Sequence, residues 1–137
     1  MQDRYLFKAK RKDDGEWVFG GLSYCEKTNA YFITNMGKDH ISYIGFHQEV
    51  DSNTICQCTG LKDKNGRVIW ENDIASYSDL ITRDKKPICI EWNKMQASFV
   101  RKYRSPMGLQ YLYLDEYIAS RMEVIGNTFD SPELLEG

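Results

Sequence analysis

Short runs in which apolar and polar residues alternate follow one another along most of this chain. The segment 4–10, for example, places Tyr5, Phe7 and Ala9 on one side of an extended chain. A period of two is typical of strands that bury one face, and turn residues separate the runs. The sequence therefore predicts an all-β protein, built as a sandwich or small barrel, with strands near 4–10, 17–24, 30–34, 41–46, 55–58, 68–70, 74–77, 87–92, 97–104, 111–114 and 122–125.

A turn-rich stretch at 48–53 divides the predicted strands into two groups. We expect antiparallel hairpins in residues 1–53 and a small β-barrel or sandwich in 54–130. Residues 131–137 form a tail or short helix, since Ser131 can cap a helix in which Pro132 comes first. A second minor helical turn is predicted within 114–120. Because no Pro- or Ser-rich linker lies between the two groups, we expect them to pack as one body.

The charge balance excludes several classes of protein. The net charge is −2 with 28% charged residues, so neither a cationic arm nor a strongly acidic tail is present. No apolar run approaches the ~18 residues that a membrane-spanning helix needs, and the first residues do not resemble the apolar core of a signal peptide. We expect a cytoplasmic protein without a membrane partner.

The four cysteines, Cys25, Cys56, Cys58 and Cys89, are expected to be free thiols in a reducing compartment. Cys56 and Cys58 lie on one face of an extended strand, where two thiolates can in principle bind a metal. A structural zinc site, however, usually has two pairs of ligands, and the sequence offers no second pair. Buried thiols are the simpler interpretation, so no metal or cofactor is predicted.

Two sharp corners lie between 63 and 73. Asp63 and Gly66 suit the first and fourth positions of a type I turn, while Asn65-Gly66 in a type I′ turn is the alternative. Glu71 and Asp73 are two residues apart, so their carboxylates can face the same way, as in a hydrolase or a magnesium site. The alternative is that they bond the turn backbone. The predicted structural turn residues are Asp63, Asn65, Gly66, Glu71, Asn72 and Asp73.

No catalytic motif accompanies these residues. The sequence lacks a Gly-x-Ser-x-Gly elbow, a glycine-rich phosphate loop and a His-Glu-x-x-His segment. His40 and His47 flank the predicted strand 41–46, and their odd separation places them on opposite faces. A cysteine paired with either histidine stays open, because spatial neighbours are not visible in a sequence. No catalytic residues are predicted, and we expect a protein that is not an enzyme.

A basic and aromatic cluster lies on two neighbouring predicted strands. Small barrels bind single-stranded nucleic acid by stacking bases on rings while cations hold the phosphates. The alternative is that the rings pack in the barrel wall and the cations face water. The residues predicted to bind nucleic acid or a protein partner are Arg101, Lys102, Tyr103, Arg104, Tyr111 and Tyr113.

The segment VDSNTICQCTGLKDKNGRVIWENDI, residues 50–74, resembles the YopX family of phage and prophage proteins. That family typically shows Thr-x-x-Gln-aromatic-Thr-Gly-Leu-x-Asp-Lys-Asn-Gly followed by Glu-Gly-Asp-Ile. FKAKRKDDGEWVFGGL at 7–22 and EVIGNTFDSPELL at 123–135 also follow the family order. Two positions depart from the pattern, since Cys58 replaces an aromatic residue and Asn72 replaces glycine.

The resemblance implies an SH3-like barrel in residues 54–130 and a protein made from a phage or prophage in a bacterial host cytoplasm. It implies no established activity and no catalytic residues. We therefore expect a non-enzymatic module that binds a phage or host protein, or that forms a homo-oligomer. The alternative is a small β-barrel that binds single-stranded nucleic acid.

Overall fold

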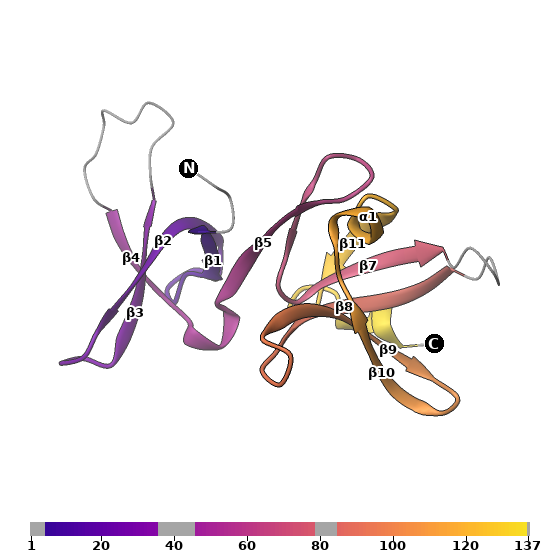
Figure 1. Ribbon diagram of the computed structural model, residues 1–137. Coiled ribbons are helices and arrows are strands. Elements are labelled where there is room, and N and C mark those ends of the chain that lie inside the picture. The colour runs from indigo at the N-terminus through magenta and orange to yellow at the C-terminus, as the bar shows by residue number, and fades with distance from the viewer. Residues whose placement is uncertain (1–4, 36–45, 79–84, 137) are drawn as a thin grey trace. The chain divides into compact units, whose positions relative to one another are not determined.

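The computed structural model describes residues 5–35, 46–78 and 85–136, and its regular structure is nearly all β-strand (Figure 1). The all-β prediction is confirmed. The chain forms two compact units, Met1–Cys58 and Thr59–Gly137. Their boundary lies within strand β5 (Cys56–Lys62), whereas the sequence places it at the turn before this strand.

Unit 1 is an antiparallel sheet in the order β4-β3-β2-β1-β5, of which β5 contributes its first residues. Its register pairs Ala9 with Val18 and Leu22 with Ile33. The predicted strand 41–46 and His40 lie outside the described residues except for Phe46, where β4 begins. The strands are β1 (Phe7–Lys10), β2 (Trp17–Cys25), β3 (Ala30–Asn35) and β4 (Phe46–Val50), and a short 3₁₀ helix, η2 (Ser52–Thr54), precedes β5.

The core of unit 1 is small and aliphatic. Ala9, Val18, Ile33 and Val50 are buried together, each from a different strand. Phe7, Leu22, Tyr31 and Ile55 pack around them and are partly buried. This cluster occupies one face of the sheet, because residues that alternate along β2 and β3 share a face.

Unit 2 is a five-stranded antiparallel sheet in the order β10-β9-β8-β7-β11. The second part of β5 forms a hairpin with β6 (Val68–Trp70). Closure of this unit into an SH3-like barrel stays a prediction. The other elements are β7 (Asp73–Ser78), β8 (Lys85–Asn93), β9 (Ser98–Ser105), β10 (Gly108–Tyr113), α1 (Glu116–Ala119), β11 (Met122–Asn127) and the 3₁₀ helix η3 (Pro132–Leu135).

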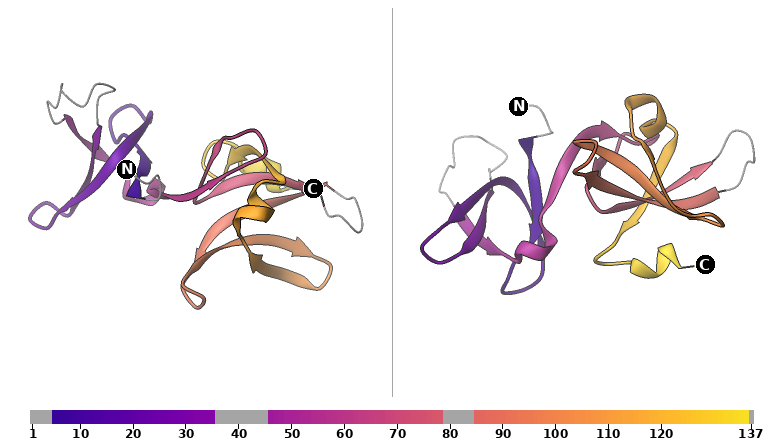
Figure 2. Two further views of the ribbon diagram at one scale, coloured as in Figure 1. Left: turned by 45° about the horizontal axis from the view of Figure 1, so that its top comes forward. Right: turned by 60° about the horizontal axis from the view of Figure 1, so that its bottom comes forward.

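The main core of unit 2 lies on one face of this sheet. Ile69, Ala75, Ile88, Ile90, Ala119, Met122 and Val124 form one buried cluster, so α1 and the β5–β6 hairpin both contribute to it. On the other face, Ile74, Cys89 and Val100 are also buried. Helix η3 contacts β8, and Figure 2 shows it beside the sheet at the C-terminal end. The middle of β8 is therefore buried on both faces.

The Asp63 carboxylate organises the turn between β5 and β6. The Gly66 amide donates to the Asp63 carbonyl at 3.0 Å, and Gly66 has a φ of 79°. Oδ1 of Asp63 accepts from the amides of Asn65 and Arg67, both at 2.9 Å. Oδ2 accepts from the amide of Val124 at 3.0 Å. One buried side chain therefore closes the turn and fixes it to β11.

The corner between β6 and β7 has a similar design. Asn72 has a φ of 70°, and its amide donates to the Ile90 carbonyl at 2.7 Å. Asp73 is buried, and its Oδ2 accepts from the Trp70 amide at 2.8 Å. The Asp73 carboxylate thus bonds turn backbone, the architectural alternative raised for Glu71 and Asp73.

Candidate functional site

The predicted basic and aromatic cluster lies on β9 and β10, which pair with each other. In this register Lys102 is opposite Tyr111, Arg104 is opposite Leu109, and Tyr113 is opposite Val100. Residues directly opposite in an antiparallel pair share a face of the sheet. Lys102, Arg104, Tyr111 and Tyr113 therefore lie together on one face, whereas Arg101 and Tyr103 lie on the other.

Arg101 and Tyr103 contact the rest of unit 2. Tyr103 packs against the buried core cluster. The guanidinium carbon of Arg101 is 5.1 Å from the centre of the Tyr77 ring. Nε of Arg101 donates to the Tyr113 carbonyl at 2.6 Å. Both side chains thus stabilise the β9–β10 hairpin, and the structure separates them from the other four predicted residues.

Of the two cations on the opposite face, Lys102 is half-buried and Arg104 is exposed. Nζ of Lys102 lies 2.6 Å from Oε1 of Glu91. The hydrogen bond to Glu91 raises the pKa of Lys102, against the opposing effect of partial burial. This ion pair offsets the Lys102 charge, so Arg104 is the more accessible cation of the face.

β10 is an edge strand with exposed side chains on both faces. It has β9 as its one neighbour in the sheet, as Figure 1 also shows. Tyr111 is 43% exposed and Tyr113 is 75% exposed. Leu109 and Leu112, which the sequence reading did not single out, are 49% and 39% exposed. The available signal was the absence of any charge between 108 and 113, which is unusual for an exposed strand.

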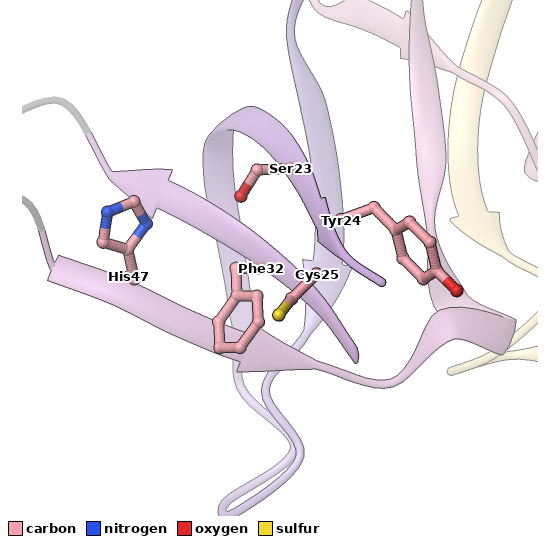
Figure 3. Close-up of a pocket in the computed structure, with 5 residues that line it drawn as sticks. All are labelled: Ser23, Tyr24, Cys25, Phe32 and His47. Atoms are coloured by element: carbon pink, nitrogen blue, oxygen red, sulfur yellow. The ribbon is translucent and has the colours of Figure 1, made fainter. Parts of the chain in front are cut away.

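A second candidate site is an open depression of about 360 Å³ in unit 1, lined by Ser23, Tyr24, Cys25, Phe32 and His47. Figure 3 shows Ser23, Cys25, Phe32 and His47 around it, while the Tyr24 side chain points away. The depression lies on the face of the β2-β3-β4 sheet opposite the core, because Ser23 pairs with Phe32 and Thr34 with His47.

The thiol and the imidazole at this depression do not form a catalytic pair. Cys25 is opposite Ala30 on β3, and His47 is opposite Thr34. Ala30 and Thr34 are four residues apart along β3, so Cys25 and His47 are offset by about 13 Å along the strand direction. Nδ1 of His47 lies 3.1 Å from Oγ1 of Thr34. The side chain and amide of Thr28 lower the pKa of the Cys25 thiol, but this register keeps His47 out of hydrogen-bond reach of it.

All four cysteines are free thiols, and Cys56, Cys58 and Cys89 are buried. Within the described ranges, no three histidine, cysteine, aspartate or glutamate side chains gather in a way that could hold a metal ion. The same residues contain no helix that is long and apolar enough to cross a membrane.

Comparison with known families decides the identity of the chain. The family model described as YopX protein matches residues 6–136, which is nearly the whole chain. The chain belongs to the YopX family. The match includes both units and therefore the edge strand β10 and the depression in unit 1.

One solved structure similar to this YopX family member is the crystal structure of protein EF1440 from Enterococcus faecalis. The two chains are 25% identical over 95% of this chain and 96% of that chain, with a TM-score of 0.47. The comparison with curated proteins gives no match.

Proposed function

We propose that this YopX family member is a non-enzymatic interaction module, encoded by a phage or prophage, that binds a protein partner through β10. The observation that carries the proposal is the exposure of Leu109, Tyr111, Leu112 and Tyr113 on an edge strand. A strand with one neighbour presents backbone N–H and C=O groups on its other side, and an extended segment of another protein can pair with them.

The composition of β10 supports this role. Proteins usually protect edge strands with charged residues, proline or bulges that prevent pairing with other chains. Gly108–Tyr113 contains neither a charged residue nor a proline, and its pairing with β9 is regular over all six residues. Aromatic residues, which are enriched where proteins bind one another, supply two of the four exposed apolar side chains. β10 thus combines open hydrogen-bonding groups with apolar area.

The proposed module is non-enzymatic, and the geometry of two groups of side chains in the described residues is compatible with that role. At the depression in unit 1, the register keeps both Ser23 and Cys25 out of hydrogen-bond reach of His47. The Asp73 carboxylate already accepts a bond from backbone. That the protein is not an enzyme stays a prediction.

Affinity capture from prophage-induced host cells tests the proposal, with Tyr111→Lys as the variant. The lysine places a charge at the centre of β10, and its side chain can stay in water because Tyr111 is 43% exposed. We expect the wild type to retain a stoichiometric partner and Tyr111→Lys to lose it. Tyr117→Lys is the matched control, since Tyr117 is 61% exposed on α1 rather than on β10.

Amide hydrogen exchange of the complex locates the contact. A partner strand paired with β10 should slow exchange in Gly108–Tyr113 more than in β7 or β8, because new hydrogen bonds protect amides of the edge strand. Equal capture by the wild type and Tyr111→Lys, or protection confined to unit 1, would contradict the proposal.

The alternative function is binding of single-stranded nucleic acid, for which the shared face of Arg104, Lys102, Tyr111 and Tyr113 provides support. Rings beside cations suit stacked bases and their phosphates. Fluorescence anisotropy with mixed-sequence DNA and RNA oligonucleotides at low and moderate salt discriminates the two functions. Micromolar binding that weakens steeply with salt and with Tyr113→Ala supports this alternative, whereas no binding at low salt removes it.

A further inference from the structure

We propose that the partner of β10 is a second copy of this chain, paired antiparallel with the first about a two-fold axis that passes midway between Tyr111 of one copy and Tyr111 of the other. This inference rests on the proposed function and names the partner that the proposed function leaves open. The observations behind it are the residue pattern of β10, its charge, and the state of the opposite edge of the same sheet.

The two faces of β10 limit the possible registers. Leu109, Tyr111 and Tyr113 share one face with Lys102 and Arg104, and Gln110 and Leu112 share the other. Residues directly opposite in an antiparallel pair always share a face. A two-fold axis perpendicular to the sheet, midway between the two strands, keeps each face of one copy continuous with the same face of the other. The axis must therefore lie level with a residue, which is then opposite the same residue of the second copy.

With the axis level with Tyr111, the apolar side chains of β10 face those of the second copy. Tyr111 is then opposite Tyr111 of the second copy, and Leu109 is opposite Tyr113. On the other face Gln110 is opposite Leu112. The exposed fractions of Leu109, Tyr111 and Tyr113, which are 49%, 43% and 75%, show the apolar surface available for these pairs. Aromatic pairs and aromatic–aliphatic pairs across strands are favourable.

Charge does not oppose this pairing. β10 carries no ionisable acid or base other than its tyrosines, so no like charges meet across the axis. The cation directly opposite Tyr111 on β9 is Lys102, whose Nζ lies 2.6 Å from Oε1 of Glu91. Arg101 lies in the row of Leu112, and its Nε bonds the Tyr113 carbonyl.

The other edge of the sheet explains why the assembly closes at two copies. β11 pairs with β7 on one side, and the β5–β6 turn bonds it through the Lys64 amide, which donates to the Met122 carbonyl at 2.9 Å. The amide of Val124, which also lies on β11, donates to the Asp63 carboxylate in the turn. Because the turn engages β11, β10 is the open edge of this sheet. Two copies joined at β10 therefore form a closed pair rather than a fibre.

Sedimentation velocity over a range of concentrations tests the inference on the full chain. We expect the wild type to dimerise, and Tyr111→Lys and Tyr111→Glu each to dissociate at least about tenfold more readily, because like charges face each other at the axis. An equimolar mixture of these two variants should dimerise again, since a lysine then faces a glutamate. Tyr117→Lys should dimerise like the wild type. Circular dichroism checks that every variant is folded.

Disulfide trapping provides a second readout of the register. In a Cys25→Ser background, Tyr111→Cys should cross-link to itself under mild oxidation, because the two introduced thiols face each other across the axis. Leu112→Cys should cross-link poorly, since in this register residue 112 is opposite residue 110.

A wild type that stays monomeric at every concentration overturns the inference, as does a Lys–Glu mixture that stays monomeric. Efficient cross-linking of Leu112→Cys but not of Tyr111→Cys overturns the register. If the wild type is monomeric and Tyr111→Lys still loses a captured partner, the proposed function stands and the second copy is not the partner. If the wild type is monomeric and Tyr111→Lys captures the same proteins as the wild type, both fail.

Discussion

At the scale of single residues, Asp63 is the side chain with the clearest energetic role. It is 5% exposed, and its carboxylate accepts three backbone amide bonds. Burial by itself raises the pKa of Asp63, but the hydrogen bonds from Val124, Arg67 and Asn65 and the charge of Arg67 outweigh burial and lower the pKa below its ordinary value. The ionised form is therefore the form that the fold stabilises.

The lowered pKa predicts loss of stability in acid. A carboxyl group whose pKa is lower in the folded than in the unfolded state stabilises the fold above the unfolded value, about 4, and this contribution disappears as the pH falls through the folded value. We expect the free energy of unfolding of unit 2 to decrease below about pH 4. Urea unfolding between pH 2 and 7, followed by amide exchange in β6 and β11, measures the effect.

Asp63→Asn tests whether this residue is the cause. Asparagine keeps one acceptor oxygen and places an NH₂ group where amides now donate, so we expect unit 2 to lose about 2–3 kcal/mol at pH 7 and much of its acid sensitivity. Glu123→Gln is the matched control. Glu123 forms an exposed ion pair with Lys64 at 3.3 Å, and its loss should cost less than about 1 kcal/mol. Equal effects of the two variants would contradict the assignment.

Gly66 allows a separate test of backbone strain. Its φ is 79°, and a Cβ added there meets no atom within 4 Å. Gly66→Ala should therefore cost about 1–2 kcal/mol through the left-handed backbone alone, while Gly66→Asn should cost less. Gly21→Ala is the control, because that site has equal space without positive φ. Thermal melting measures the difference, and an alanine at 66 that is harmless would show that the turn relaxes.

At the scale of elements, the contact between β11 and η3 depends on a residue without a side chain. A Cβ at Gly126 would lie 2.8 Å from Cδ1 of Leu134 and 3.2 Å from Cβ of Ser131. We expect Gly126→Ala to destabilise unit 2 by about 1 kcal/mol, because the Leu134 side chain has to shift and the Ser131 side chain has to give way by a few tenths of an ångström. Urea unfolding and amide exchange of η3 measure the loss.

A double-mutant cycle identifies the contact responsible. Leu134→Ala removes the atom nearest to the added methyl group, so Gly126→Ala should cost at least about 0.5 kcal/mol less in that background. Additive effects of the two substitutions would mean that η3 does not pack against Gly126. Phe19→Ala, at a 47% exposed position of unit 1, gives the baseline for an unrelated truncation.

The sequence predicts the existence of strands better than their order. Strands near 87–92, 97–104 and 122–125 follow from alternation, and β8, β9 and β11 lie there. Which strand forms an edge depends on long-range pairing, which alternation does not contain. β10 is an edge because the chain leaves it through α1 and returns as β11 beside β7, at the other side of the sheet.

The same limit applies to the candidate site. A period of two already separates Arg101 and Tyr103 from Lys102 and Arg104, so the sequence could have divided the cluster between two faces. It could not show which face is covered, because the contacts of Tyr103 with the core arise from distant parts of unit 2. Nor could it reveal the Lys102–Glu91 pair, whose members lie on different strands.

At the scale of the whole molecule, the described residues form two buried hydrophobic clusters. Ile33 belongs to that of unit 1 and Ile90 to that of unit 2, and both side chains are fully buried. The proposed contact strand β10 belongs to unit 2 and the depression beside Cys25 to unit 1. A substitution that weakens one core therefore tests whether binding through β10 depends on unit 2 alone.

Separate cores predict separate local stabilities. We expect Ile33→Ala to accelerate amide exchange in β2, β3 and β4 by removing about 2–5 kcal/mol of local stability, and to leave exchange in β7, β8 and β9 unchanged. Ile90→Ala should do the reverse and should also weaken any binding through β10, because β9 and β10 are held by β8. Exchange measured on the intact chain distinguishes this from a single cooperative core, for which each substitution would accelerate both sets of strands equally.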